Sequence, residues 1–454
     1  MSKCLKRMIL ETSGYALPSV LLITMLVVTS IMGLLTVIFF YDGISMRMIE
    51  KKKLDLAGYS ALQMLLSDTT GISAGNRIYN IDSISVTTNT RLKGFYWEVT
   101  TIAKGKNDSS LVNYLLGSPR EQSVLFTNAI VLSRPNLRAT VAGNTKITGN
   151  ILATTKRITK GNIFGLPPVK KNYLDGEIIV DTDIPVQLAQ DSLFDKTYYD
   201  LANRNSSYIE FESFHLDENT IKTIDGSELI KLSADLQLSG KLNSAERNIP
   251  VDIFAVGKVI INKDTYSDVD LSIIAGSEVE IGKNVHLENV LIFSESAITI
   301  SADSYFKNVQ FFSRDKIIIR GSLFDYPSLI CLNIDASDSS KLNNSLDISS
   351  SVINGAVLLM TSSSGLSSNK TKIKIDDKSK IQGVIYSENN LELLGEVQGS
   401  VYSYNFWFYK EPTEYTNWLV NIHVNRRDMS DWFLLPAALS ESTKLEVLKK
   451  SCIY

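Results

Sequence analysis

A long apolar segment dominates the first part of the hydrophobic pattern. Residues 15–41 contain no Asp, Glu, Lys or Arg. As a helix that rises ~1.5 Å per residue, this segment is longer than the ~30 Å hydrocarbon core of a bilayer. It is also longer than the apolar core of a cleaved secretory signal, and further helical sequence follows it. We therefore predict a retained single-pass membrane helix within residues 15–70.

The pattern after this segment predicts a stalk and then a small sheet. Leu54, Ala57, Ala61 and Leu65 recur at helical spacing, which indicates that the helix continues beyond the membrane with one apolar face. Glycines near residue 71 end the helical pattern. Residues 71–123 contain two runs rich in aromatic and β-branched side chains, which predict a β-hairpin region.

From about residue 124 the chain becomes self-similar. Short β-branched triplets alternate with Gly, Asn, Asp and Ser, and residues 258–277, 278–296 and 297–315 form successive units. Each unit has too few apolar residues for a core of its own, whereas stacked units bury these residues in columns. The repeat therefore predicts a parallel β-helix, or solenoid. Two blocks keep the period, the first being Val279-Glu280-Ile281, Ile298-Thr299-Ile300 and Ile317-Ile318-Ile319, and the second Asn289-Val290-Leu291 and Asn308-Val309-Gln310.

Two weaker repeats set the limits of the solenoid. Residues 381–387 resemble 397–403, which predicts that the stack resumes near Lys372, and residues 147–151 resemble 158–163, which predicts a start near Ala139. We place the solenoid at residues 124–405, with an insertion at about 185–250 and a loop at about 333–371. The fold class is thus mainly β, with an N-terminal transmembrane helix and a small α+β region before the solenoid.

The last segment, 406–454, holds three of the 4 tryptophans. The end of a solenoid exposes strand edges and apolar columns, so it needs a cap. We predict that this aromatic segment is the C-terminal cap. An aromatic platform on which sugars stack is the alternative.

Charge and cysteine content narrow the function classes. The formal net charge is −3, and a short basic cluster follows the apolar segment. This overall balance predicts no nucleic-acid partner. Cys4, Cys331 and Cys452 lack the spacing of a metal site or a disulfide framework, and both a Cys331–Cys452 bridge and two separate thiols remain open. The 3 histidines lie far apart in the sequence. We predict no metal and no cofactor.

The first residues of the chain resemble a known family. A short basic leader, residues 1–14, ends in Gly14 and is followed by Tyr15 and the apolar helix. This order resembles the class III signal of type IV prepilins and pseudopilins, which a peptidase cuts after the glycine. Residues 50–63 are also similar to the stretch after the span in PilX-like and K-type minor subunits. The resemblance implies cleavage between Gly14 and Tyr15, and packing of the helix against other pilin-like subunits.

Two positions depart from the family pattern. Most members carry a glutamate at the fifth position of the mature chain, where this sequence has Ser19. A carboxylate inside the membrane is useful to a subunit that receives a neighbour's α-amine, so its absence resembles minor subunits at a filament tip. Pro18 suits the first turn of a helix that begins near Tyr15. An uncleaved signal anchor is the alternative.

Candidate chemistry is limited to paired carboxylates. Parallel β-helices include polysaccharide lyases and hydrolases, and Asp181 with Asp183 and Asp376 with Asp377 are the candidate acid and base pairs. Solvated turn carboxylates explain the same pairs. The sequence has no GxSxG, P-loop, GxGxxG or HExxH motif. We predict that the chain is not an enzyme and has no catalytic residues.

Together these patterns favour a non-enzymatic, pilin-like or pseudopilin-like minor subunit that presents an extracytoplasmic solenoid. The expected roles are filament assembly, secretion or surface adhesion. The expected partners are the lipid bilayer and pilin-like subunits, both through the N-terminal helix, and a surface or glycan ligand is not identified. Most of the chain is expected in the periplasm or at the cell surface. One alternative is a membrane-tethered scaffold, because the Gly-centred turns resemble bactofilin-like polymer-forming β-helices. The other is a cell-surface, glycan-active β-helix enzyme.

Overall fold

The computed structural model describes most of the chain, and backbone alone for residues 2–17, 208–210, 222–223 and 449–453. The described residues are 2–68, 73–106, 108–119, 123, 125–187, 194–196, 198–199, 208–212, 214–223, 229–243, 250–334, 344–361, 371–440 and 445–453. The chain divides into two compact units. Unit 1 comprises Met1–Leu65, Asn76–Asn89 and Thr100–Val112, and unit 2 comprises the remaining residues.

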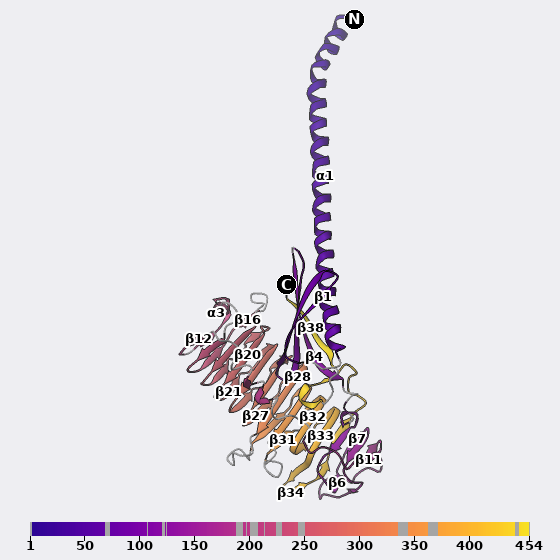
Figure 1. Cartoon of the computed structure of the whole chain (residues 1–454), viewed down its shortest axis with the longest axis vertical. Coiled ribbons are helices and arrows are strands. Elements are labelled where there is room, and N and C mark those ends of the chain that lie inside the picture. The colour runs from indigo at the N-terminus through magenta and orange to yellow at the C-terminus, as the bar shows by residue number, and fades with distance from the viewer. Residues whose placement is uncertain are drawn as a thin grey trace. The chain divides into compact units, whose positions relative to one another are not determined.

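Unit 1 is built around one long helix, α1 (Ser2–Leu66), which ends beside short strands (Figure 1). Leu54, Ala57 and Ala61 of α1 pack against Val86 and Ala103, and these five side chains form a small buried core. The helical spacing read from the sequence thus marks the face of α1 that is buried. The strands that begin or lie in this unit are β1 (Gly75–Ile81), β2 (Ile84–Lys93), β3 (Tyr96–Lys104) and β4 (Ser109–Pro119).

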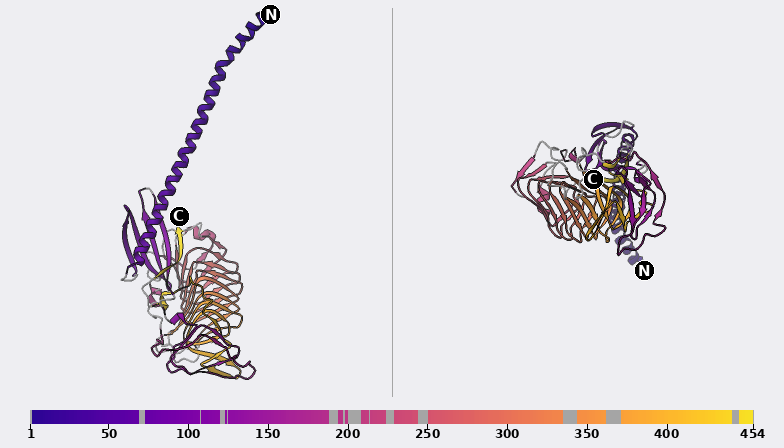
Figure 2. Two further views of the ribbon diagram at one scale, coloured as in Figure 1. Left: turned by 90° about the vertical axis from the view of Figure 1, so that its right-hand side faces the viewer. Right: turned by 90° about the horizontal axis from the view of Figure 1, so that it is seen from below.

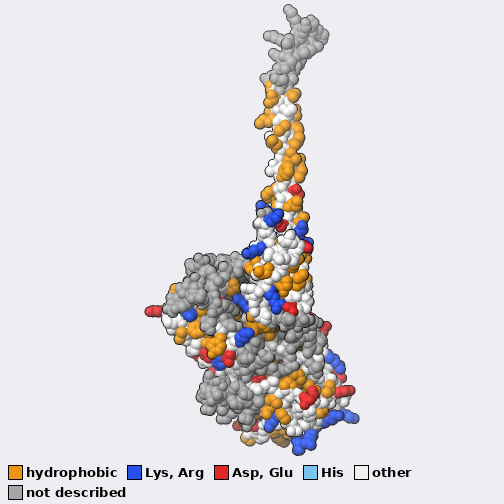
Figure 3. Space-filling model, viewed as in Figure 1, with side chains coloured by type: hydrophobic (Ala, Val, Ile, Leu, Met, Phe, Trp, Pro, Cys, Tyr) orange, Lys and Arg blue, Asp and Glu red, His pale blue; other side chains and the backbone are white. Residues whose placement is uncertain are grey.

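The first half of α1 carries the apolar segment. Among the described residues, α1 is the one helix long and apolar enough to cross a membrane, and its apolar window is not buried. Orange side chains cover this part of the helix in Figure 3. The backbone is helical from Ser2 and continues through Pro18, so the helix does not begin near Tyr15. The hydroxyls of Thr24 and Thr36 donate to carbonyls four residues earlier, which satisfies these polar groups within the helix.

Unit 2 contains the predicted parallel solenoid. One 29-stranded sheet winds through it, and most coils have three short strands (Figure 2). Each strand pairs in parallel with its equivalent in the next coil. The mainly β fold that the sequence predicts is therefore confirmed. Two neighbouring coils are β20 (Leu271–Ala275), β21 (Val279–Ile281) and β22 (His286–Glu288), then β23 (Val290–Ser294), β24 (Ala297–Ile300) and β25 (Tyr305–Lys307).

We name the three faces of the solenoid A, B and C after β20, β21 and β22, in that order. The other strands of the early coils are β12 (Tyr208–Phe211), β13 (Phe214–Leu216), β14 (Leu229–Leu232), β15 (Leu236–Leu238), β16 (Lys241–Leu242), β17 (Val251–Ala255), β18 (Val259–Ile261) and β19 (Tyr266–Ser267). Those of the later coils are β26 (Gln310–Ser313), β27 (Lys316–Arg320), β28 (Leu323–Ile334), β29 (Ser345–Ser349), β30 (Val352–Thr361), β31 (Lys372–Ile375), β32 (Lys380–Leu393) and β33 (Glu396–Lys410).

The register of the coils follows the sequence repeat. Ile281, Ile300 and Ile319 are successive Cα partners on face B, and all three are buried in the core. The later repeat is confirmed as well, because Gly383 pairs with Gly399. The early repeat between 147–151 and 158–163 is not a stacking register. Ile158 pairs with Ala139 instead of Ile147, which pairs with Leu174.

The stacking order of the coils differs from the chain order. After β33 the stack continues with β36 (His423–Asn425) and β5 (Ile130–Leu132). Residues 139–180 form the two coils beyond them, with pairs β36–β7, β5–β8, β7–β10 and β8–β11. The strands of these coils are β6 (Ala139–Ala142), β7 (Lys146–Thr148), β8 (Ile151–Ala153), β9 (Ile158–Lys160), β10 (Leu174–Asp175) and β11 (Ile178–Val180).

This order corrects the predicted C-terminal cap. Residues 406–454 do not close the end of the stack, because β35 (Trp418–Val420) pairs with β6 and β36 pairs with β7. Other segments pack against the core in the first and last coils. At one end α3 (Glu218–Thr223) places Ile221 in the core, and at the other end Val169 and Tyr173 of segment 161–173 pack against it.

The interruptions in the stack are also shorter than the sequence suggests. Strands β12 to β16 lie in the predicted insertion, 185–250, yet they pair in parallel as part of the coils. Strands β29 and β30 similarly lie within the predicted loop, 333–371. Long connections between strands break the sequence period there, although the stacking itself continues.

Face A is apolar on its outer side as well as its inner side. Ile274, Phe293, Phe312 and Cys331 stack in one outward column and are buried. Three segments cover the column. They are the tip of the β2–β3 hairpin with Phe95 and Tyr96, the connection 184–199 with Ile184 and Phe194, and segment 429–439 with Phe433 and Leu439.

Cys331 is the one cysteine whose side chain is described, and it lies in this apolar layer. The Cys331 sulfur lies 3.7 Å from the Met360 sulfur in the apolar cover of face A. The side chain of Cys452 lies outside the described residues, so a bridge between Cys331 and Cys452 stays open.

The inward columns predict a large, site-specific effect of a buried charge. Ile300→Asp places an unpaired carboxylate at a position that is 0% exposed, which we expect to lower the free energy of unfolding by several kcal/mol. Thr299→Asp, one residue away and pointing outward, is the matched control. Thermal melting of both variants tests the register, and equal melting temperatures would show that Ile300 does not point inward.

Candidate functional site

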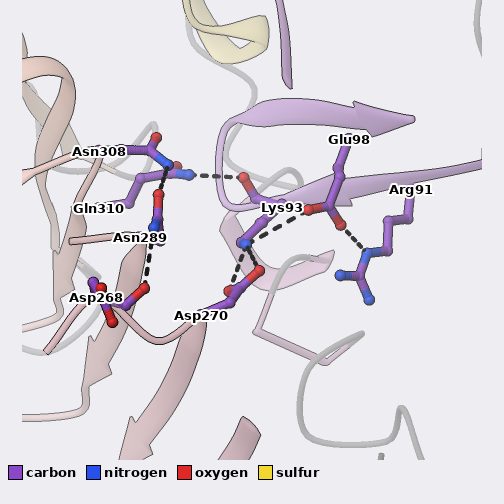
Figure 4. A network of polar contacts seen from close by, with 8 residues as sticks. All are labelled: Arg91, Lys93, Glu98, Asp268, Asp270, Asn289, Asn308 and Gln310. Carbon is purple, nitrogen blue, oxygen red and sulfur yellow. Dashed lines mark hydrogen bonds and ion pairs between the residues drawn. The ribbon is translucent and has the colours of Figure 1, made fainter. Parts of the chain in front are cut away.

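The tip of the β2–β3 hairpin is fastened to face A by one glutamine. Gln310 occupies the column position that Leu291 and Leu329 hold in the neighbouring coils, and it is 4% exposed. Its Oε1 accepts a hydrogen bond from the Phe95 amide at 2.9 Å. Figure 4 shows its other contact, in which Nε2 donates to the Lys93 carbonyl at 2.9 Å. A single side chain thus pairs with both backbone groups of the turn, which would otherwise be buried without partners.

Charged side chains surround this contact. Lys93 Nζ lies 2.6 Å from both carboxylate oxygens of Asp270 and 3.5 Å from Glu98. Arg91 Nε donates to Glu98 at 2.5 Å (Figure 4). Burial by itself lowers the pKa of Lys93, but Asp270 and Glu98 outweigh burial, so the pKa lies above its ordinary value. The pKa of Arg91 is raised for the same reason, with Glu98 as the main partner. Both side chains therefore stay charged and the cluster is internally balanced.

Gly94 permits the close approach of the turn to Gln310. Its φ is +61°, and a Cβ atom built there would lie 2.0 Å from Gln310 Oε1. A side chain at this position would both strain the backbone and displace the amide. The turn therefore requires glycine for two independent reasons.

A pair of stacked asparagines holds the neighbouring corner of the solenoid. Asn289 and Asn308 both have positive φ angles, 62° and 52°. Asn308 Nδ2 donates to Asn289 Oδ1 at 2.9 Å, and Asn289 Nδ2 donates to the Asp268 carbonyl at 3.4 Å (Figure 4). Asparagine tolerates this backbone conformation and bonds its neighbours in adjacent coils. Asp270 and Gln310, which contact the hairpin, each follow a residue of this corner, Asp268 and Asn308, by two positions.

The other two covering segments are fastened in a comparable way. Arg314 lies 2.7 Å from Asp195 and 3.1 Å from Glu295, and its guanidinium stands 4.9 Å from the centre of the Phe194 ring. These contacts hold the connection 184–199. In segment 429–439, the Leu434 amide donates to the Tyr326 hydroxyl at 2.9 Å. The outer side of face A is thus fixed by polar anchors at the edge of an apolar layer.

The residues implied by the prepilin resemblance lie along α1. Gly14 and Tyr15 are within its helical backbone, and their side chains are outside the described residues. Ser19 is exposed on the same helix. The structure therefore leaves the cleavage and assembly roles of these positions as predictions.

The candidate carboxylate pairs lie in turns. Asp181 Oδ1 accepts a hydrogen bond from the Asp183 amide at 2.9 Å, and both residues are exposed. Asp376 accepts from the Ser350 amide at 3.0 Å and from the Ser379 hydroxyl at 2.5 Å, while Asp377 is exposed. These contacts join turns of the chain. The prediction that the chain is not an enzyme stays a prediction.

Each histidine has its own surroundings. His286 stacks between the rings of Tyr266 and Tyr305 on face C, His215 bonds Ser239, and His423 bonds the Asn144 carbonyl. Among the described residues, no three His, Cys, Asp or Glu side chains are grouped so as to hold a metal ion. The absence of a metal or cofactor is still a prediction for the whole chain.

The aromatic residues near the C-terminus do not form an open platform at Trp407. The Lys372 ammonium stands 3.6 Å from the centre of the Trp407 ring, and the ring of Tyr409 is parallel to it at 6.1 Å between centres. Trp407 is therefore 8% exposed. Because a sugar stacks on a free ring face, this geometry does not favour the sugar-binding alternative at that residue.

Two features of the charged and polar pattern were missed in the sequence. Gln310 replaces a leucine of the repeated block, and a polar residue in an apolar column is the signal that something must bind it there. Between Glu121 and Asp175 the chain also contains eight Lys and Arg residues after Ser133 and no Asp or Glu. The net charge of −3 for the whole chain conceals this basic stretch.

Comparisons with known proteins add little to the geometry. No protein-family model and no curated protein sequence matches the chain. Among solved structures, an ice-binding protein from an Antarctic bacterium, Flavobacteriaceae, is similar at 11% identity with a TM-score of 0.17, over 68% of this chain and 98% of that chain. We base no functional argument on this likeness.

The fastening by Gln310 predicts that Gly94→Ala is more damaging than an equivalent change elsewhere. Gly240→Ala is the matched control, because Gly240 has a φ of +74° with no atom within 4 Å of an added Cβ. Both variants strain the backbone, but only Gly94→Ala leaves buried backbone groups of the turn without partners. We expect it to cost at least about 2 kcal/mol more than the control.

Hydrogen exchange of the Phe95 amide measures the loss of its hydrogen bond to Gln310 directly. Protection should fall in Gly94→Ala and in Gln310→Ala, and the double variant should be little worse than either single variant. Additive losses would contradict the shared contact.

Proposed function

We propose that this chain is a non-enzymatic, pilin-like minor subunit. Its N-terminal helix anchors it in the cytoplasmic membrane or in a filament, and it presents a rigid β-solenoid on the extracytoplasmic side. The proposed partners are the lipid bilayer and the helices of other pilin-like subunits. The proposed role is mechanical and recognitional, in filament assembly, secretion or surface adhesion.

The arrangement of α1 is the observation that carries this proposal. One helix bears an exposed apolar segment in its first half and packs Leu54, Ala57 and Ala61 against strands in its second half. An apolar surface that stays exposed in the folded chain requires lipid or other apolar helices around it. The helix is continuous between the two halves, so the exported part moves together with the membrane part. This suits a subunit that is drawn from the membrane into a filament.

The construction of unit 2 supports a presenting role for the solenoid. Gln310, Lys93 and Asp270 fix a hairpin tip to the coils, and strands β2 and β3 run from this tip into unit 1. A stack of parallel coils with close-packed columns is stiff, because each coil is held by its neighbours over its whole length. Such a body holds a surface residue in a fixed position, which suits recognition more than movement.

The two alternatives receive less support. A bactofilin-like scaffold polymerises end to end through open coils, whereas α3 and segment 161–173 place apolar side chains against the core within the first and last coils. A glycan-active enzyme needs converging acid and base groups, whereas Asp181 and Asp376 accept hydrogen bonds within turns.

Cleavage of the leader is the first test of this proposal. In cells with a prepilin peptidase, the membrane-extracted chain should begin at Tyr15, and Gly14→Leu should retain the leader because the peptidase no longer finds its glycine. Ser13→Ala is the matched control and should be processed. Intact-mass measurement distinguishes the products, and a chain that begins at Met1 in all samples would contradict the prepilin assignment.

The copy number of the subunit is the second test. A shaft subunit repeats one contact along the filament and needs the carboxylate at each copy, whereas a tip subunit does without it. We expect sparse immunogold labelling at filament ends and no gain in filament yield from Ser19→Glu.

Ser30→Glu is the control for that variant, since it puts a carboxylate in the same apolar segment away from any N-terminal amine. Dense labelling along sheared filaments would exclude the tip position. A large gain in yield from Ser19→Glu alone would exclude it as well.

A further inference from the structure

The last two coils of the solenoid carry an unbalanced positive charge. Eight basic residues lie between Ser133 and Asn172, with no acidic residue among them. All but Arg134 are exposed, and none of the eight forms an ion pair within the described part of the chain. We call this surface the basic end, and it consists of Arg134, Arg138, Lys146, Lys156, Arg157, Lys160, Lys170 and Lys171. Lys and Arg side chains are visible where β6 and β11 lie (Figure 3).

Folding alone does not account for this placement. The Ala139 amide donates to the Arg157 carbonyl at 3.1 Å, which sets Arg138 beside Arg157 in adjacent coils. Like charges on neighbouring strands repel and destabilise a sheet. Acidic residues of the end coil begin only at Asp175, which pairs with Arg427 at 2.8 Å. Within the described residues, none of the cations of residues 138–171 forms an ion pair, and the carboxylates of the last coil begin only at Asp175.

A fully exposed phenylalanine projects from the same end. Phe164 is 99% exposed, four residues after Lys160 and six before Lys170. Its neighbours hold it in place, because Ile163 is buried, Leu166 packs on the same small cluster, and the Leu166 amide donates to the Ile163 carbonyl at 3.0 Å. Lys410 Nζ also donates to the Phe164 carbonyl. The ring is therefore displayed by an ordered turn, at a cost in exposed apolar surface.

We propose that the basic end docks on the surface of an anionic phospholipid bilayer, with the lysines and arginines facing the headgroups and Phe164 entering the interface. Basic side chains near such a surface are each attracted by the negative potential, and an apolar ring among them adds burial. Duplex DNA or polyphosphate would be bound by the charges alone and would leave Phe164 without a role. Proteins that bind single-stranded nucleic acid stack successive bases on several aromatic rings, whereas Phe164 is the one aromatic residue between Arg134 and Lys171. This inference goes beyond the proposed function and does not rest on it.

The experiment uses the full chain with its apolar helix embedded in nanodiscs of phosphatidylcholine. The occupied nanodisc prevents α1 from inserting elsewhere. Labelled vesicles of phosphatidylcholine, with and without phosphatidylglycerol, are then added and recovered by flotation. We expect the protein to follow the vesicles only when phosphatidylglycerol is present, and less so at high salt.

Two variants separate charge from apolar insertion. The triple variant Lys156→Gln, Lys170→Gln, Lys171→Gln should weaken binding on the order of a hundredfold, on the basis of about fivefold for each of the three charges. Its control, Lys263→Gln, Lys283→Gln, Lys378→Gln, removes the same charge from exposed positions elsewhere and should bind normally. Phe164→Ser should weaken binding on the order of fivefold. Its control is Val256→Ser, at a residue 56% exposed on an earlier coil.

Either of two results overturns the proposal. One is equal binding of the two triple variants, which would show that the charge acts without regard to position. The other is unchanged binding of Phe164→Ser together with full competition by a DNA duplex or polyphosphate, which would identify a soluble polyanion as the ligand. All substituted residues are exposed, and matching melting temperatures confirm that the variants are folded.

Discussion

The apolar outer side of face A is the constraint on which the rest of the structure depends. A strand in a one-sided sheet buries alternate residues, but on face A both sets are apolar, as Phe293 and Phe312 stack outward while Ile292 and Phe311 stack inward. A surface of this kind is stable only when something covers it. Segments from three distant parts of the sequence supply the cover, and each is held by a polar anchor. Gln310 is the clearest of these anchors, because a polar side chain stands at an apolar column position and binds the backbone of the hairpin turn.

The same constraint explains how an out-of-order solenoid holds together. Residues 130–180 form coils at one end of the stack, and the chain then resumes at the other end with β12. Two described residues of the connection between them, Ile184 and Phe194, are buried on face A. The described part of this connection therefore belongs to the cover that the apolar face needs. The aromatic layer of Phe194, Phe293 and Phe312, with ring centres 4.4–5.7 Å apart, ties the two requirements together.

The sequence predicts what is local and periodic, and it misses what depends on distant pairing. The apolar segment of α1, the buried face at Leu54 and Ala57, and the column Ile281, Ile300, Ile319 all follow from spacing within short stretches. The pairing of His423 with Lys146 joins residues far apart in the chain, and no sequence repeat indicates it. The predicted aromatic cap is wrong for that reason, because residues 139–180, and not the last residues of the chain, form the last two coils of the stack. The one sequence signal for the contact at Gly94 is that Gln310 replaces a leucine of the repeated block. Its partner, the Phe95 amide, lies more than two hundred residues earlier in the chain.

Charged residues are distributed differently on face A, which stabilises the fold, and on the basic end. Lys93 and Arg91 are paired with Asp270 and Glu98, and Arg314 is paired with Asp195 and Glu295, so these three cations near face A have counter-ions. The residues of the basic end have none within the described chain. Because a buried cation must be balanced for the protein to fold, paired charges are explained by stability. Exposed like charges in adjacent coils slightly oppose folding, so their retention needs a cause outside the folded chain. A rigid solenoid suits that division, since columns of buried isoleucine and phenylalanine provide the stability and leave most cations of the basic end available to a partner.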